Sequence, residues 1–157
     1  MWTSLFGLTN LIALAAWTLL VALPRRAFVL AAVLYLGVGL LCLAYTAMLV
    51  ALVSGAADPV QIAGAARAGL TNYSIPGIRA LFASDGGLVI GWTHYLALDL
   101  FAGLWIARDA DAKGFSRVVQ VPFLMATFLA GPLGLLSWLI VRERRARKAA
   151  KAAKAAR

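Results

Sequence analysis

The stretch that decides the fold runs from residue 86 to residue 107 and reads GGLVIGWTHYLALDLFAGLWIA. It contains one acid, Asp99, near its middle. A run of about 20 apolar residues has the length of a helix that crosses a bilayer. Strands would need a closed barrel of many shorter alternating segments, and the sequence lacks that pattern. The stretch therefore predicts a transmembrane α-helix, which satisfies its own backbone hydrogen bonds in lipid.

Three more apolar runs of similar length accompany this one, at residues 4–23, 28–54 and 119–141. Each is long enough to span a bilayer as a helix. The four runs predict an all-α, polytopic membrane protein: a transmembrane domain of four helices over residues 1–141, followed by a basic, solvent-exposed tail over residues 142–157.

The composition agrees with a membrane protein and excludes two other classes. Of the 157 residues, 63% are hydrophobic and 13% are charged, and the mean hydropathy is +0.88. Soluble domains have about a quarter of their residues charged, and disordered chains have low hydrophobicity. The chain nevertheless has a net charge of +9.

The tail supplies most of that positive charge. Its basic residues are Arg142, Arg144, Arg145, Arg147, Lys148, Lys151, Lys154 and Arg157. Basic side chains near a membrane surface are attracted to anionic lipids. We expect anionic headgroups to bind Arg144, Arg145, Arg147 and Lys148. No base-reading element accompanies these residues, so we do not expect nucleic acid to be a partner.

The links between the predicted spans give conflicting signals about orientation. Four spans place both termini on one side, and basic residues collect on the cytoplasmic side. The tail therefore indicates cytoplasmic termini in a bacterial inner membrane, and that is the orientation we expect. Short links with basic residues indicate the opposite: Arg25, Arg26, Arg108, Lys113 and Arg117.

The longest link, residues 55–85, contains a short apolar pattern. Ile78, Leu81 and Phe82 have the i, i+3, i+4 spacing of one helix face. This spacing is typical of a short interfacial helix, although an ordinary loop fits equally well.

Metal and cofactor chemistry have little support in the sequence. The chain has one cysteine, Cys42, and one histidine, His94, so it cannot build a site from Cys and His ligands alone. It also lacks a glycine-rich phosphate loop and a dinucleotide fingerprint. We therefore expect no metal and no cofactor.

Asp99 is the first candidate for chemistry. An acid in the middle of a span is costly and faces a partner, water or a pocket, so it is a functional candidate by default. The alternative is a hydrogen bond that only fastens two helices. His94 lies about 140° from Asp99 around a straight helix. The two could share a pocket only from its two flanks, or across a kink.

Two further positions could shape a ligand site. Pro132, between Gly131 and Gly134, is expected to bend the fourth span, either as a packing kink or as a kink that opens a ligand groove. Asn10 is an isolated polar residue in the first span. It either packs between helices or completes a polar cluster around Asp99.

One long motif resembles a known family. Residues 92–101 read WTHYLALDLF and are followed by Gly103, Trp105, Ile106 and Asp109. Together with IRALF at 78–82 and GPLGL at 131–135, this motif resembles the abscisic-acid-deficient-four-like family. Its plant members are membrane proteins required for making neoxanthin from violaxanthin. The resemblance covers about residues 70–142.

The resemblance implies a carotenoid or other isoprenoid ligand. Conversion of violaxanthin to neoxanthin is a redox-neutral isomerisation, in which an epoxide opens and an allene forms. It needs an acid and a base but no cofactor. The resemblance implies that Asp99 is the acid and that His94 is the base or orients the substrate. Four aromatic residues would line the polyene: Trp92, Tyr95, Phe101 and Trp105.

Three functions follow as alternatives. The first is a cofactor-independent carotenoid isomerase, and the second is a non-catalytic scaffold that binds a carotenoid or isoprenoid. The third is a small transporter or channel subunit. The sequence supports it weakly, because it has a single buried acid to form an ion path and lacks an internal repeat. A homo-oligomer is compatible with a chain of this size, but the sequence indicates no stoichiometry.

Overall fold

The structure is a computed structural model that describes residues 1–64, 69 and 71–155, with side chains described as far as Arg144. Over these residues the regular structure is helical, and one isolated β-bridge joins Gln61 to Ser84. The elements are α1 (Trp2–Ala22), α2 (Ala27–Ala32), η1 (Val33–Gly39), α3 (Leu40–Val53), α4 (Ile75–Phe82), α5 (Asp85–Ala112), α6 (Arg117–Leu129) and α7 (Gly131–Ala155).

Three helical stretches in the described part of the chain are long and apolar enough to cross a membrane. They are α1, the continuous helix Ala27–Val53 formed by α2, η1 and α3, and α5. The first three predicted runs are therefore helices. The middle of the second is a π-helix, η1, which places Gly37 against Ala16 of α1 and Leu100 of α5.

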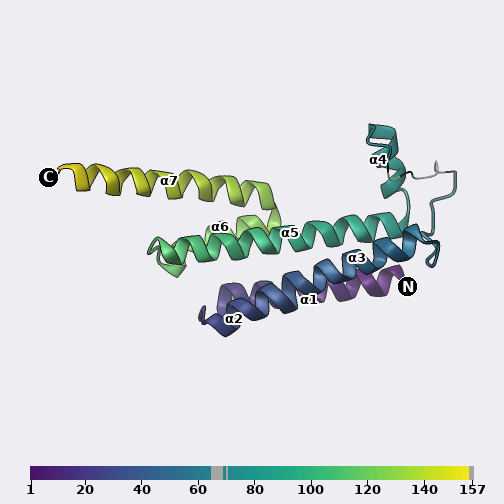
Figure 1. Ribbon diagram of the computed structural model, residues 1–157, viewed down its shortest axis with the longest axis horizontal. Coiled ribbons are helices and arrows are strands. Elements are labelled where there is room, and N and C mark those ends of the chain that lie inside the picture. The colour runs from purple at the N-terminus through teal and green to yellow at the C-terminus, as the bar shows by residue number, and fades with distance from the viewer. Residues whose placement is uncertain (65–68, 70, 156–157) are drawn as a thin grey trace.

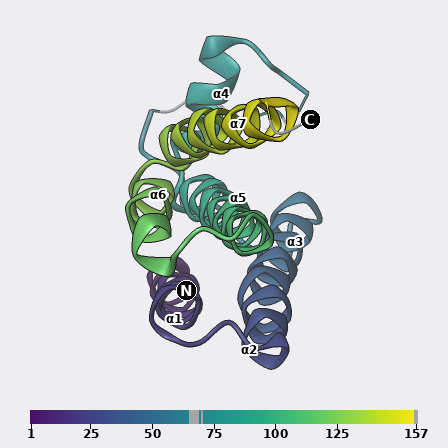
Figure 2. The ribbon, with the colours of Figure 1, turned by 90° about the vertical axis from the view of Figure 1, so that its left-hand side faces the viewer.

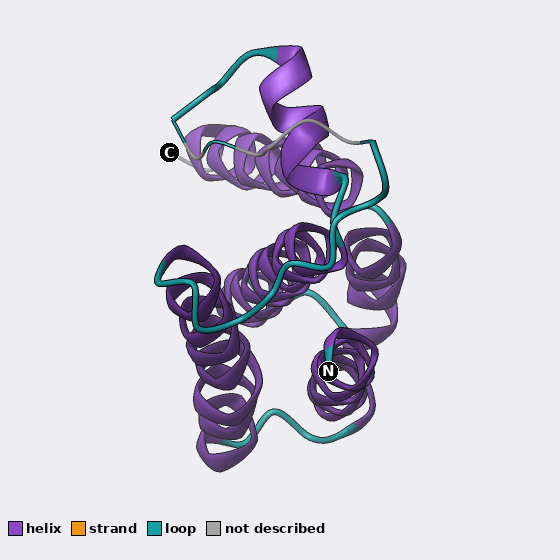
Figure 3. Ribbon diagram, turned by 90° about the vertical axis from the view of Figure 1, so that its right-hand side faces the viewer, coloured by secondary structure: helices purple, strands orange, loops and turns teal. Residues whose placement is uncertain are grey.

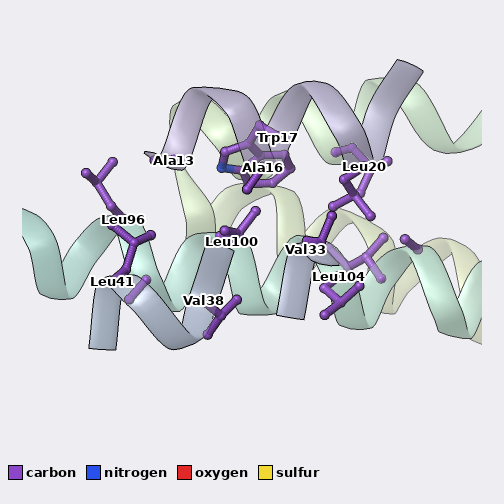
Figure 4. Close-up of a cluster of buried hydrophobic side chains, with 14 of the residues drawn as sticks. Ala13, Ala16, Trp17, Leu20, Val33, Val38, Leu41, Leu96, Leu100 and Leu104 are labelled. Carbon is purple, nitrogen blue, oxygen red and sulfur yellow. The ribbon is translucent and has the colours of Figure 1, made fainter. Parts of the chain in front are cut away.

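Helix α5 is the central element. It contacts α1, α3, η1, α4, α6 and α7, and the end views show it between the α1–α3 pair and the α6–α7 pair (Figures 2 and 3). The main core forms where α1, η1, α3 and α5 face one another (Figure 4). There Trp17 lies directly on Gly103, where any Cβ would overlap the indole ring. Close packing through small residues is typical of helix contacts in membranes.

The predicted fourth span, residues 119–141, is not a single helix. Helix α6 ends at Leu129, Ala130 has non-helical torsions (φ −156°, ψ 77°), and α7 begins at Gly131. The two helices pack against each other and run in opposite directions, so this segment is a hairpin (Figure 1). We define residues 117–141 as the α6–α7 hairpin.

The hairpin has a local cause in the sequence. Proline lacks an N–H and is well tolerated in the first turn of a helix, where that N–H would have no partner. Pro132 is the second residue of α7, so it starts a helix and does not bend one. Gly134 lets the helices approach, because a Cβ there would overlap Thr127 of α6.

The hairpin changes where the chain ends. The N-terminus lies at one end of the bundle and α7 runs out at the other, the end that also holds the α1–α2 and α5–α6 links (Figure 1). The two ends of the described chain therefore lie at opposite ends of the bundle, whereas four spans would place both termini on one side. Residues 142–155 continue α7 as a helix. The predicted lipid contacts Arg145, Arg147 and Lys148 lie outside the described side chains, and Arg144 is exposed.

The short helix expected in the long link is present as α4. Ser74 caps its N-terminus by accepting a hydrogen bond from the Gly77 N–H. The helix lies crosswise to α5 at the N-terminal end of the bundle (Figure 1). Ile75 and Phe82 are exposed, and an apolar helix in this position is typical of a membrane interface.

Candidate functional site

Asp99 lies at the tip of the α6–α7 hairpin. It is a buried residue near the middle of α5, and its Oδ1 lies against Gly131, the first residue of α7. Its carboxylate interacts with the Gly131 N–H and with the Tyr95 hydroxyl, while Oδ2 is buried without a hydrogen-bond partner. The expected partner for this acid therefore exists, and it is the first turn of α7.

The contact has a clear electrostatic basis. The first N–H groups of a helix have no partner within the helix, and they carry a partial positive charge. In lipid no water is available to satisfy them. Asp99 supplies an acceptor to the first turn of α7, and a Cβ on Gly131 would overlap Oδ1.

Tyr95 contacts the end of α6, on the other side of the hairpin tip. Its hydroxyl donates to the carbonyl oxygen of Leu129, the last residue of α6, over 3.4 Å. Tyr95 and Asp99 are four residues apart on α5 and lie on one face. Together they contact the end of α6 and the start of α7.

Trp92 adds an aromatic surface beside Tyr95. The two rings stack with centroids 5.4 Å apart and planes 24° apart. The Trp92 Nε1–H donates to Asn10 Oδ1 of α1 over 3.1 Å, and Asn10 Nδ2 donates to the Phe6 carbonyl over 2.7 Å. Phe6 also lies near the Trp92 ring, at 6.1 Å between centroids.

Three neighbouring grooves lie beside α1 on the side where Trp92 and Tyr95 are found. The first, about 430 Å³, is lined by Phe6, Phe82, Leu88, Gly91, Trp92 and Tyr95. The second, about 250 Å³, is lined by Asn10, Ala13, Leu14, Trp92, Tyr95, Leu96, Phe128 and Leu129. The third, about 290 Å³, is lined by Leu14, Trp17, Thr18, Val21, Ala22, Met125 and Phe128.

Neighbouring grooves share side chains. Trp92 and Tyr95 line the first and second, and Leu14 and Phe128 line the second and third. We call this series the α1–α5 seam. It follows α1 from Phe6 to Ala22, and its walls are apolar and aromatic, a lining typical of sites for apolar ligands.

The structure separates the other predicted site residues from the seam. His94 is exposed and its ring lies 5.6 Å from Tyr45 of α3, whereas Asp99 faces α7. Phe101 is half exposed, and Trp105 lies under the Arg142 guanidinium at 5.4 Å. Pro132 is exposed beside the hairpin tip. The site residues that the structure does bring together are Asn10, Trp92, Tyr95 and Asp99.

A polar network at the end of the bundle where α7 emerges was not expected from the sequence. Arg25, with a side chain only 5% exposed, forms an ion pair with Asp111 over 2.9 Å and a hydrogen bond to buried Gln120. Gln120 also donates to Asp111 over 2.9 Å. Arg25 therefore fastens the α1–α2 link to α5 and α6.

A second set of charges in this region joins α7 to α5. Asp109 pairs with Lys113 over 2.7 Å and with Arg142 over 2.9 Å. It also accepts from the indole N–H of fully buried Trp138 over 3.0 Å. These contacts hold the outgoing helix of the hairpin beside the end of α5.

Comparison with known proteins gives one match. A family model described as ABA DEFICIENT 4-like matches residues 4–138, which include most of α1, all of α5, the residues that line the seam and most of the α6–α7 hairpin. No curated protein and no solved structure shows significant similarity to the chain.

Proposed function

The chain belongs to the ABA DEFICIENT 4-like family, and on that premise we propose that it is a membrane-embedded carotenoid-tailoring protein. The proposed activity is a cofactor-independent isomerisation of an oxygenated carotenoid. The family match and the apolar helices support a carotenoid-related role in a membrane.

The observation that carries the proposal is the α1–α5 seam. A carotenoid is a long, apolar rod, and the seam is a series of apolar grooves that share lining side chains. The stacked Trp92 and Tyr95 rings offer flat surfaces to a polyene. The buried carboxyl group of Asp99 interacts with Tyr95 and lies outside the groove linings.

The proposed chemistry needs one proton donor and one acceptor. A proton passes to the epoxide oxygen, a carbon–oxygen bond breaks, and a carbon-bound proton leaves as the allene forms. A carboxyl group that gives a proton and then takes one back returns to its starting state. Asp99 fits this role because it is a buried carboxyl group and the carboxylate it leaves would lie against the first turn of α7, where the helix dipole favours negative charge. The role that the resemblance implies for His94 lacks support, since His94 faces α3.

The first test is conversion by purified protein. Wild-type protein in lipid vesicles containing violaxanthin should yield an isomer of the same mass, detected by chromatography. Asp99→Asn keeps an acceptor for the Gly131 N–H but cannot donate a carboxyl proton. It should retain bound pigment while conversion falls by about 10²–10⁴-fold.

The matched control is Asp58→Asn, which neutralises an exposed acid in the link after α3 and should convert normally. Full conversion by Asp99→Asn would contradict the assignment of the acid.

A non-catalytic carotenoid-binding scaffold is the second candidate. It is favoured by the contact between Asp99 and Gly131, which gives the carboxylate a purely structural task. In that case wild-type protein binds pigment without converting it, and Asp99→Asn behaves as wild type.

We also propose an orientation in a bacterial inner membrane. Because α6 and α7 form a hairpin, the basic links and the outgoing helix lie at one end of the bundle (Figure 1). The basic residues there include Arg25, Arg26, Arg108, Lys113, Arg117, Arg142 and Arg144. By the positive-inside rule this end faces the cytoplasm, and the N-terminus faces the opposite side. Arg144 is exposed, and we propose that it binds anionic headgroups.

A further inference from the structure

The polar atoms of the α1–α5 seam differ in how fully they are engaged. Asn10 uses its oxygen to accept from Trp92 and its amide nitrogen to donate to Phe6. The Trp92 N–H is used by the same contact. The Trp92 N–H is therefore committed within the protein, and both polar atoms of Asn10 already make one hydrogen bond there.

The Tyr95 hydroxyl is less firmly held. Its hydrogen bond to Leu129 spans 3.4 Å and is exposed, whereas a good O–H···O bond measures about 2.7–2.8 Å. Tyr95 lines the first and second grooves of the seam. An acceptor in the second groove could replace the Leu129 carbonyl at little cost.

Asp99 occupies a different position from Tyr95. It is buried, it is absent from the linings of the three grooves, and its carboxylate meets Gly131 and Tyr95. A ligand in the seam would contact Tyr95 but not Asp99. Asp99 could therefore exchange a proton with the ligand only through the tyrosine hydroxyl.

We infer that Tyr95 is the residue that recognises oxygen on the ligand, and that Asp99 is the positioning residue behind it. This inference rests on the proposed function and identifies which side chain touches the substrate. The ligand group is a hydrogen-bond acceptor, a hydroxyl or an epoxide oxygen, carried on an apolar isoprenoid chain.

The same arrangement supplies a balanced proton path. The Tyr95 O–H bond breaks as its proton forms a bond to the ligand oxygen. The Asp99 O–H bond breaks as its proton restores the tyrosine hydroxyl. Asp99 is left as a carboxylate facing the Gly131 N–H, and the proton that leaves the ligand carbon returns by the reverse route. No oxidant, reductant or second substrate is consumed.

The test is a competition between two pigments with the same carbon skeleton. Purified protein in detergent is offered equal amounts of zeaxanthin, which carries two ring hydroxyls, and β-carotene, which carries none. The bound pigments are then extracted and quantified. Wild-type protein should prefer zeaxanthin by about twofold to tenfold, the range expected for one neutral hydrogen bond.

Variants separate recognition from positioning. Tyr95→Phe should bind the two pigments equally and lose conversion of violaxanthin. Asp99→Asn should keep the preference while losing conversion. Tyr35→Phe is the matched control, because Tyr35 is 69% exposed on η1 and away from the seam, and it should keep both properties. A thermal melt of each variant reports any loss of folding.

The possible failures are distinguishable. If wild-type protein binds neither pigment, both the proposed function and this inference are wrong. If wild-type protein binds both pigments without preference, or if Tyr95→Phe keeps the wild-type preference, Tyr95 is not the recognition residue and the carotenoid-binding function still stands.

Discussion

Asp99 is a carboxylate in the middle of an apolar helix, and its surroundings explain how the fold tolerates it. An acid near the centre of a span costs about 2.5–3.5 kcal/mol on insertion scales. Here Oδ1 meets the Gly131 N–H at the start of α7, where the helix dipole favours negative charge. The acid and the helix start therefore stabilise each other.

Residue 131 must be glycine for this contact to form. Gly131→Ala places a methyl group on Asp99 Oδ1 and should destabilise the protein by about 1–3 kcal/mol, the usual cost of overpacking. The measurement is a thermal melt of the purified variant in detergent.

The control is Gly7→Ala in α1, where no atom lies within 4 Å of the added carbon. That variant should be at least as stable as wild type, because alanine is favoured over glycine in a helix. Equal melting temperatures for Gly131→Ala and wild type would show that the hairpin tip does not rest on Asp99.

At the scale of elements, the α6–α7 hairpin decides the topology. Its apolar segments are each too short to cross a bilayer: α6 has 13 residues, or about 20 Å of helix, against a hydrocarbon core of about 30 Å. The tip lies beside Asp99 near the middle of α5, so the hairpin enters from the basic end and returns to it (Figure 1). On these lengths, α1, Ala27–Val53 and α5 are long enough to span a bilayer, and we propose that the hairpin does not.

This topology predicts a labelling pattern that four spans cannot produce. In a Cys42→Ala parent, single cysteines replace Ala56 after α3, Ala112 at the end of α5, and Glu143 in α7. All three positions are exposed. A membrane-impermeant maleimide added to intact cells should label only the cysteine at position 56, and cell lysis should expose the other two.

Four spans would instead put positions 112 and 143 on opposite sides. Labelling of one of these two cysteines, but not the other, in intact cells would contradict the hairpin. Labelling of both, with position 56 protected, would keep the hairpin but reverse the proposed orientation.

The sequence predicted the elements better than their directions. The three long spans follow from hydropathy alone, because each apolar run exceeds the bilayer thickness. Residues 119–141 have the same hydropathy as a span. Their reversal depends on the torsions of Ala130 and on a contact from Gly131 to Asp99 on another helix, and no local pattern encodes that contact. Pro132 fits either a kink or a helix start.

The sequence also predicted only part of the site, because contacts between residues far apart in the chain leave no local pattern. Asp99 is conspicuous as an acid within an apolar run, and Tyr95 and Trp92 precede it on the helix by about one and two turns. Helix periodicity alone indicates that His94 lies on a different face, and the structure places it against Tyr45 of α3. The partner of Arg25 could not be predicted, because Gln120 and Asp111 reach it only through the folded links.

At the scale of the whole molecule, the bundle combines a basic end with an apolar flank. Arg25, Asp111 and Gln120 fasten the helices at the basic end. The α1–α5 seam lies along the flank and reaches the hairpin tip through Phe128 and Leu129. This arrangement leaves the seam open to molecules dissolved in the membrane, which is the source of a carotenoid substrate in the proposed function.

The most direct test of the account is the pigment content of a seam variant. Trp92→Ala removes the ring shared by the first two grooves and should lower the carotenoid that co-purifies from a pigment-producing host by about tenfold or more. The control, Phe28→Ala, removes an aromatic ring that is 82% exposed and outside the seam, and should keep wild-type pigment content. Pigment bound equally by wild-type protein and Trp92→Ala would contradict the seam as the binding site.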